Sequence, residues 1–190
     1  MNKVEKYKKL VDKYTKENRK KDEEYLENLG KKLRQTNFKD FIEKNVMTSY
    51  PEHKWFILRY RKGRFLKEAS DHILSKEEEI RQVKNFDDLI LLIDDITVPY
   101  FKALTKYDTA IVIGKAIGKM PNKVYLHAGP EKTCKKLFGE DYNKKVKYLK
   151  DRESLPYIDV KDFPTAFDSL KSTPDLMENC LCYIYSNYVK

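Results

Sequence analysis

The sequence has few of the residues that build disulfide frameworks, turn-rich β-folds or membrane spans. Its three cysteines, Cys134, Cys180 and Cys182, are an odd and sparse set that favours a reducing, cytoplasmic compartment. Six glycines among 190 residues are too few for an all-β fold with many tight turns. No apolar run has the length that spans a bilayer, and the lysine-rich start lacks the apolar segment of a signal peptide. We therefore expect a soluble protein without disulfides and without a membrane partner.

Charged residues are abundant, and basic ones are in excess. The chain has 39 lysines and arginines against 30 acidic residues, a formal net charge of +9, and its 41% of hydrophobic residues is enough for a core. Residues 1–36 carry 12 basic and 7 acidic side chains, and residues 119–154 carry 10 and 5. Such basic blocks are typical of a nucleic-acid-binding surface, because each neutralised phosphate releases counterions. The same excess is typical of a lysine-rich proteome, so both interpretations stay open.

Helical periodicity runs through most of the chain. An apolar stripe at helical spacing opens it, formed by Val4, Tyr7, Val11 and Tyr14. The stripe stops in the polar stretch 15–24 and then resumes, without any internal repeat or low-complexity linker afterwards. The sequence predicts an all-α fold with a single compact multi-helix domain. Residues 1–36 are expected to form a basic helical N-terminal arm or hairpin, and residues 37–190 the helical core.

Three later helices are marked by their ends. Asn85 is a good N-cap for the first of them. The second is expected to begin at Thr105, with Asp108 in its first turn, and to end at Gly118. Its small residues, which allow close approach of another backbone, are Ala110, Gly114 and Gly118. Thr173-Pro174-Asp175 is a strong start for a final helix that is apolar on most of its circumference and therefore buried.

Residues 85–140 contain two short helices, a tight turn, a small-residue helix and a Val-x-x-His element in that order. The segments concerned are Leu104-Thr-Lys-Tyr-Asp-Thr109-Ala110 and Pro121-Asn-Lys-Val-Tyr-Leu-His127. This order resembles the helix-hairpin-helix DNA glycosylases, and it implies a helix-hairpin-helix-like element here. The family's hairpin glycines are absent between Leu104 and Ala110. Asp108 stands where bifunctional members have a catalytic lysine, and Tyr125 where the family has an aspartate. The resemblance therefore implies a monofunctional glycosylase, without a Schiff-base lyase step.

The activity that the resemblance implies is base excision, the hydrolysis of the N-glycosidic bond of a damaged or modified base flipped out of DNA. Asp108 is the candidate carboxylate that supports an oxocarbenium-like centre and orients water, with His127 and Tyr125 as hydrogen-bonding partners. Tyr107 is expected to line a base pocket together with Tyr125. Helix capping by Asp108 and a structural role for His127 are the alternatives at these positions.

Basic residues, some of them beside aromatic ones, are the expected DNA contacts, because arginine binds phosphates in a bidentate manner and lysine as a point charge. They are Arg59, Arg61, Lys62, Arg64, Lys115, Lys119 and Lys123. No cofactor and no metal are expected. Cys180-Leu-Cys182 lacks a second ligand pair, and His53, His72 and His127 share no ligand spacing.

Two other functions stay open at the level of the sequence. The first is a non-catalytic helical protein that binds DNA or another protein, because the glycines, the lysine and the aspartate of the family are missing. The second is an enzyme that acts on a small polar metabolite, because basic pockets also bind phosphates.

Overall fold

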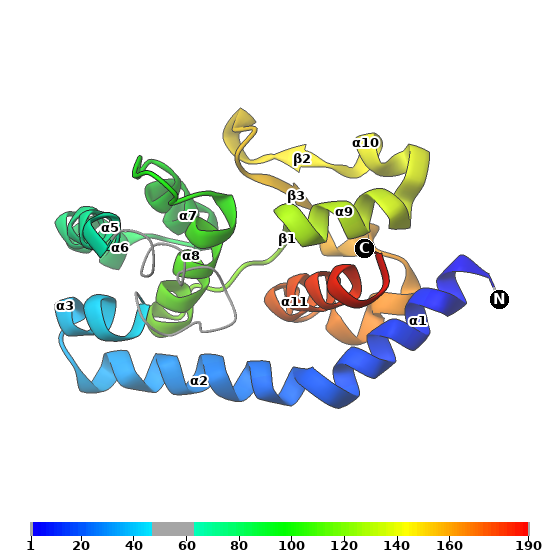
Figure 1. The fold of residues 1–190 in the computed structure, drawn as a ribbon, viewed down its shortest axis with the longest axis horizontal. Helices are drawn as coiled ribbons and strands as arrows, with labels where there is room; N and C mark the ends of the chain where they lie inside the picture. The colour runs from blue at the N-terminus through cyan, green and yellow to red at the C-terminus, as the bar shows by residue number, and fades with distance from the viewer. Residues whose placement is uncertain (1, 47–62, 190) are drawn as a thin grey trace. The chain divides into compact units, whose positions relative to one another are not determined.

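The computed structural model describes residues 2–46 and 63–189, and it is predominantly helical (Figure 1). The all-α fold class expected from the sequence is confirmed. Three short strands, each of two or three residues, were not predicted.

The chain divides into two compact units. Unit 1 consists of Met1–Glu24 and Pro121–Lys190, and unit 2 consists of Tyr25–Met120. The boundary between them falls within helix α2 (Lys20–Gln35). This division differs from the expected arm at 1–36 and core at 37–190, because the first residues of the chain cluster with its C-terminal part.

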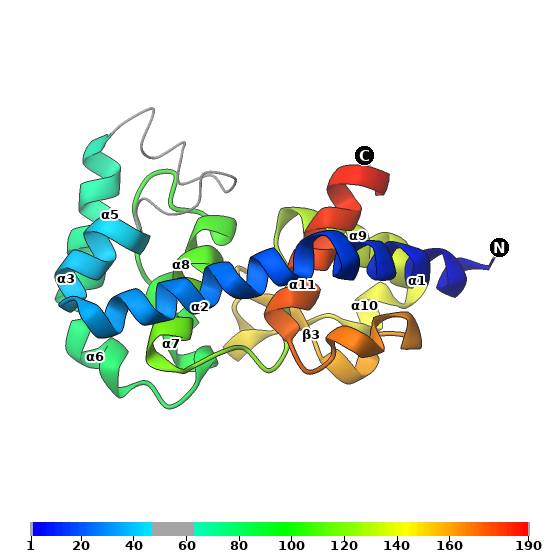
Figure 2. The same cartoon turned by 90° about the horizontal axis from the view of Figure 1, so that it is seen from below.

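Unit 1 begins with helix α1 (Lys3–Tyr14), which runs beside α11 (Pro174–Ile184) in both views (Figures 1 and 2). The Asn2 side chain accepts a hydrogen bond from the Glu5 N–H, which satisfies one of the first amides of α1. The buried side chains of α1 recur at helical spacing and are Tyr7, Leu10, Val11 and Tyr14. The polar stretch that follows is helical as well. It opens with a wider, π-helical turn, Thr15–Arg19, which buries no residue.

Unit 1 also contains a small three-stranded antiparallel sheet. Strand β3 (Pro156–Ile158) lies between β1 (Val124–Tyr125) and β2 (Lys147–Tyr148). Val124 is paired with Ile158, and both side chains are buried in the core. The remaining elements are α9 (Ala128–Phe138), α10 (Tyr142–Lys145) and the 3-10 turns Gly139–Asp141, Leu149–Asp151, Val160–Asp162 and Thr165–Leu170, before the final π-helical turn Tyr185–Val189.

The core of unit 1 draws on both ends of the chain. Apolar side chains of α1 pack with those of β1, α9, the turn Thr165–Leu170 and α11. Helix α11 starts at Pro174, as predicted, and most of its residues are buried. The members of this core in α11 are Leu176, Met177, Cys180, Leu181 and Ile184. Packing on several sides therefore holds α11 in place within the unit.

Unit 2 contains the rest of α2, α3 (Phe38–Phe41), the turn Ile42–Val46, α5 (Gly63–Ser75), α6 (Glu77–Gln82), α7 (Phe86–Asp94) and α8 (Ala103–Ile117). Asn85 caps α7 as predicted, because its side chain accepts a hydrogen bond from the Asp88 N–H. Helices α7 and α8 pack against each other. A Cβ atom added at Gly114 would collide with the Lys119 carbonyl oxygen just past the end of α8, and it would lie 3.3 Å from the Phe86 side chain and 3.4 Å from that of Leu89. The small size of Gly114 therefore accommodates the end of α8 and the side chains of α7 rather than the backbone of another element.

The start of α8 differs from the sequence-based expectation. The helix begins at Ala103 after Lys102, two residues before the expected cap Thr105, and it ends at Gly118, whose φ of 74° is left-handed. Leu104–Ala110 therefore lies wholly inside one helix, and the hairpin turn that the resemblance implies is not at these residues. This segment contains neither glycine nor proline, so nothing in it interrupts helical hydrogen bonding.

Candidate metal centre

The three residues expected to be catalytic belong to different parts of the chain. Asp108 is a buried residue in the middle of α8 and belongs to unit 2. Tyr125 in β1 and His127 at the start of α9 are buried in unit 1. Tyr107, expected in a base pocket, is buried in unit 2 with its ring centroid 6.2 Å from that of Phe86. Tyr125 and His127 thus belong to the same unit, two residues apart in the chain, whereas Asp108 belongs to the other.

The expected DNA contacts are placed only in part. Arg59, Arg61 and Lys62 lie outside the described residues, and so does the side chain of Arg64. Lys115 and Lys119, at the end of α8, are partly exposed. The Lys123 ammonium group lies 4.4 Å from the centroid of the Tyr157 ring, which is a cation–π contact.

His127 meets two residues of α11 that the sequence did not single out together with it. Its backbone is extended, and it directly precedes α9. The preceding residue, Leu126, donates a 2.8 Å backbone hydrogen bond to the Pro156 carbonyl, which holds this segment on the small sheet. Glu178 and Cys182 are four residues apart on α11 and therefore lie on the same face of that helix.

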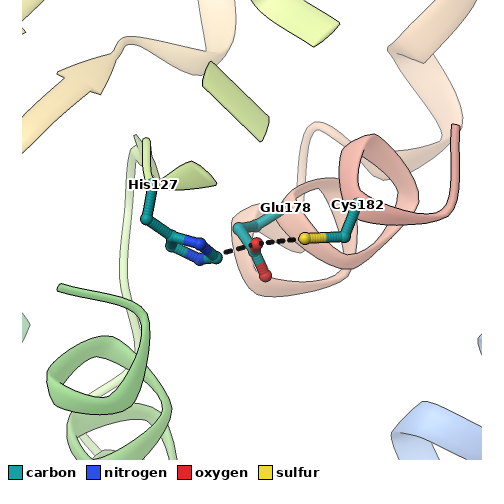
Figure 3. Close-up of side chains that lie close together, drawn as sticks. All are labelled: His127, Glu178 and Cys182. Atoms are coloured by element: carbon teal, nitrogen blue, oxygen red, sulfur yellow. Dashed lines mark hydrogen bonds and ion pairs between the residues drawn. The ribbon is translucent and has the colours of Figure 1, made fainter. Parts of the chain in front are cut away.

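The polar atoms of these three residues converge on one carboxylate oxygen. The His127 Nε2 atom lies 2.8 Å from Glu178 Oε1, and the Cys182 thiol donates a 3.3 Å hydrogen bond to the same oxygen. One nitrogen, one oxygen and one sulfur atom thus all lie within 4.8 Å of one another. In Figure 3 the Glu178 carboxylate lies between the imidazole ring and the thiol.

Burial makes this arrangement costly unless the charges are compensated. The side chains of His127 and Glu178 are 3% and 2% exposed, whereas Cys182 is partly exposed. A carboxylate removed from water needs a nearby positive charge or several hydrogen-bond donors. A protonated His127, or a bound cation, supplies such a charge at Glu178.

Two residues of α9, Gly129 and Thr133, allow this helix to lie close to α11 beside His127. A Cβ atom added at Gly129 would lie 3.3 Å from Cys182 Sγ and 3.3 Å from Tyr185 Cδ1, so a larger residue would displace these side chains. One turn later, the buried Thr133 hydroxyl donates a 2.9 Å hydrogen bond to the Leu181 carbonyl. The close approach of the two helices positions His127 against Glu178.

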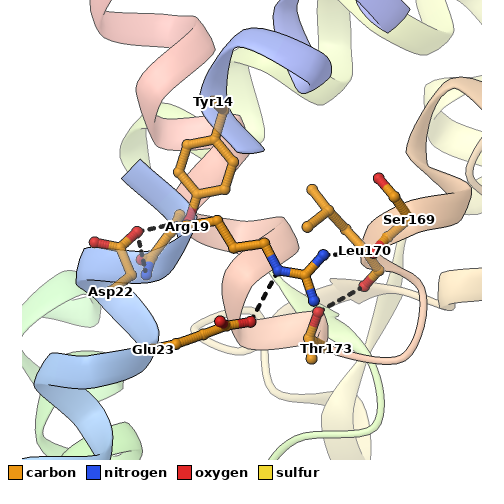
Figure 4. A network of polar contacts seen from close by, with 8 residues as sticks. Tyr14, Arg19, Asp22, Glu23, Ser169, Leu170 and Thr173 are labelled. Carbon is orange, nitrogen blue, oxygen red and sulfur yellow. Dashed lines mark hydrogen bonds and ion pairs between the residues drawn. The ribbon is translucent and has the colours of Figure 1, made fainter. Parts of the chain in front are cut away.

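A polar network contacts α11 at Asn179, the residue next to Glu178 (Figure 4). The Tyr14 hydroxyl donates a 2.6 Å hydrogen bond to Asp22, and the Asn179 amide donates a 3.4 Å bond to the same carboxylate. Arg19 pairs with Glu23 at 2.8 Å and donates to the Ser169 carbonyl. These contacts hold the segment after α1 against the middle of α11 at Asn179 and against the turn that precedes α11 at Ser169.

The three cysteines differ in their accessibility. All three are free thiols, but Cys134 and Cys180 are buried in the core, and burial raises the pKa of both thiols well above the ordinary value. Cys182 is partly exposed and lies beside a carboxylate. Cys182 is therefore the thiol of this chain that is suited to ligation.

This cluster was not predictable from sequence spacing. Only the four-residue separation of Glu178 and Cys182 is visible in the sequence, and a carboxylate with a thiol at that spacing is common on ordinary helices. His127 is far from both in the sequence. The spacing rules for zinc motifs cover ligands that come in local pairs, so they miss a set assembled from two separate segments.

Among the residues that the structure describes, no helix combines the length and apolar character needed to cross a membrane. No protein-family model, no curated protein and no solved structure matches the chain.

Proposed function

We propose that unit 1 binds a divalent transition-metal ion of borderline softness, such as zinc, through His127, Glu178 and Cys182. The observation that carries this proposal is the convergence of three different donor atoms within 4.8 Å in a largely buried position. Imidazole and thiolate ligands favour zinc, cobalt and nickel over magnesium and calcium, which prefer oxygen ligands alone.

The distances between the donors suit a metal ion after a small adjustment. Zinc bonds of about 2.0–2.3 Å in a tetrahedron place neighbouring donor atoms roughly 3.3–3.8 Å apart. The 2.8 Å and 3.3 Å contacts to Glu178 are at or below this range, and all separations are under 4.8 Å. A bound ion would replace the two hydrogen bonds to Glu178 with metal–ligand bonds.

Charge balance also supports the proposal. The Cys182 thiolate and the Glu178 carboxylate each carry one negative charge, and neutral His127 carries none. Together they neutralise a divalent cation. The occupied site then has no net charge, so its burial does not incur the free-energy cost of removing an uncompensated charge from water. Three protein ligands leave one tetrahedral position for water or a substrate, and the partly exposed Cys182 marks the side of access.

Titration of the purified, metal-free chain with zinc tests the proposal. We expect one ion per chain and an affinity that falls as the pH is lowered, because protons compete for Cys182 and His127. Cys182→Ser and His127→Asn should each weaken binding by more than about 100-fold, beyond the effect of removing a mere supporting hydrogen bond. Isothermal titration calorimetry measures the number of ions bound per chain and the dissociation constant for the wild type and for each variant.

Matched controls separate this site from adventitious binding. Cys180→Ala removes a buried thiol from the same helix, and His72→Asn removes a histidine of unit 2, so both should bind zinc normally. Cobalt should give a sulfur-to-metal charge-transfer band that disappears in Cys182→Ser. Zinc at 100 times its dissociation constant should also raise the free energy of unfolding of the wild-type chain by about 2.7 kcal/mol. Zinc binding that is absent from the wild type, or unchanged in Cys182→Ser, contradicts the proposal.

Base excision from DNA stays a separate prediction, supported by the sequence resemblance alone. It rests on Asp108 in unit 2 and on Tyr125 and His127 in unit 1, and His127 is also a ligand of the proposed metal centre.

A further inference from the structure

We infer that the exposed face of α1 binds the phosphate backbone of a nucleic acid. This inference concerns a different surface from the metal centre and does not rest on it. The lysines of this face follow a helical stripe and are Lys6, Lys9, Lys13, Lys16 and Lys20. Lys6, Lys9 and Lys13 are spaced by three and then four residues and therefore follow one side of α1, whereas Lys16 and Lys20 lie in and just after the wider turn Thr15–Arg19 and extend the basic surface along the chain.

The geometry of α1 directs this stripe to solvent. The apolar side of the helix is buried in the core of unit 1 through Tyr7, Val11 and Tyr14, among others. All five lysines of the stripe are exposed. At 1.5 Å per residue, Lys6 to Lys16 covers roughly 15 Å of helix axis, and a DNA duplex presents one charge about every 1.7 Å of its own axis.

Most acidic residues along this segment already have local partners. Asp12 pairs with Lys8 at 3.0 Å, Glu24 with Lys20 at 3.7 Å, and Glu23 with Arg19. Glu17 accepts a hydrogen bond from the Tyr183 hydroxyl, and Asp22 accepts one from Tyr14. Apart from Glu24, which pairs with a lysine of the stripe itself, these acids interact with residues outside the stripe.

The central lysines of the stripe are not neutralised in the same way. Within residues 2–46 and 63–189, Lys6, Lys9 and Lys16 form no ion pair. Lys13 donates a hydrogen bond to the Tyr188 hydroxyl, and this bond, together with the nearby Glu17 carboxylate, raises the pKa of Lys13. Several lysines elsewhere in unit 1 are paired with an acid, for example the exposed Lys135 and Lys144 and the partly exposed Lys171. The uncompensated charge of α1 is therefore available to an anionic partner.

A nucleic acid fits this face better than a lipid surface does. A helix that lies on a membrane inserts an apolar face, but the apolar side chains of α1 are buried in the core, apart from Val4. Lysine ammonium groups contact phosphates as point charges, and they carry no direct information about base sequence. We therefore expect binding that depends strongly on salt and little on sequence.

Fluorescence anisotropy with a labelled DNA duplex of mixed sequence tests the inference. For the wild type, the logarithm of the association constant should fall linearly with the logarithm of salt between about 50 and 200 mM. The triple variant Lys6→Gln, Lys9→Gln, Lys16→Gln should bind at least about tenfold more weakly at the lowest salt. Its salt slope should be smaller by roughly 2–3, because each phosphate that is no longer neutralised lowers the slope by about 0.9.

A second triple variant, Lys135→Gln, Lys144→Gln, Lys171→Gln, is the matched control. It removes the same total charge from lysines that are ion-paired and lie outside α1, so it should keep most of the affinity and the wild-type slope. Thermal unfolding of both variants verifies that they fold. Equal losses of affinity in the two variants would overturn the inference in favour of a net-charge effect. Absence of wild-type binding at low salt would also overturn it, as would binding to anionic vesicles but not to the duplex.

Discussion

Thr133 is the side chain that ties the helix following His127 to the helix that carries Glu178 and Cys182. Its hydroxyl is fully buried and donates to the Leu181 carbonyl across the contact between α9 and α11. A buried hydrogen bond contributes more to the free energy of unfolding than an exposed one, because water cannot replace the lost partner at a buried polar group. The proposed metal centre is therefore supported by a residue that contributes no ligand.

We expect Thr133→Val to lower the free energy of unfolding by about 1–2 kcal/mol, because valine keeps the shape of threonine but lacks the donor. Thr36→Val is the matched control, since the Thr36 hydroxyl donates to the Lys32 carbonyl at an exposed position. The control should change stability by less than about 0.5 kcal/mol. Urea unfolding measures both values, and equal effects would show that burial of the Thr133 bond is unimportant.

At the scale of elements, the attachment of the N-terminal helix to α11 depends on Tyr14. Burial, followed by the neighbouring Asp22 carboxylate, raises the pKa of Tyr14, so its hydroxyl stays protonated and donates to Asp22. The ring also lies 5.8 Å from that of Tyr183, centroid to centroid. Tyr14 thus contacts α11 directly through the Tyr183 ring, and its charge-assisted hydrogen bond holds Asp22, whose carboxylate also accepts a bond from Asn179 of α11.

Tyr14→Phe should destabilise the chain by about 1.5–3 kcal/mol, the usual contribution of a hydrogen bond to a charged group. Tyr183→Phe is the matched control on the other side of the same contact. Its hydroxyl donates to Glu17 at an exposed position, and we expect a decrease in stability below about 0.5 kcal/mol. Chemical denaturation distinguishes the two variants. A harmless Tyr14→Phe substitution would mean that Asp22 is satisfied by other groups.

At the scale of the whole molecule, burial of acidic hydroxyls and thiols determines how stability responds to alkali. Burial raises the pKa of Tyr7, Tyr14 and Tyr142, and of the Cys134 and Cys180 thiols. Above about pH 9–10 the unfolded chain releases these protons, whereas the folded chain retains them. Because the folded state then binds more protons, stability is fully present below this range and is lost as the pH rises.

Urea unfolding at a series of pH values should therefore show a free energy of unfolding that falls above about pH 9. Each buried group contributes a slope of up to about 1.4 kcal/mol per pH unit. Tyr14→Phe should make the decline shallower, because it removes one of the buried groups whose pKa is raised. A stability that stays constant up to about pH 11 would contradict the expected role of these buried groups.

The helical class and several helix ends were predictable from the sequence, because they depend on neighbouring residues. Asn85 caps α7 through an amide three residues away, and Pro174 opens α11 within its own first turn. Gly118 ends α8 because it adopts a left-handed conformation that its lack of a Cβ atom allows. The start of α8 was misplaced because Thr105 has a capping residue's chemistry, yet helical hydrogen bonding extends past it to Ala103.

Only the tertiary structure decided which distant residues meet. The periodicity of α1 indicated an apolar face, but not that this face packs with α9 and α11 in one core. His127 was recognised as a candidate by its chemistry, whereas Glu178 and Cys182 were not placed beside it. Local signals act over three or four residues along one element. The approach of His127 to α11 instead depends on close packing between elements, which Gly129 permits and Thr133 secures.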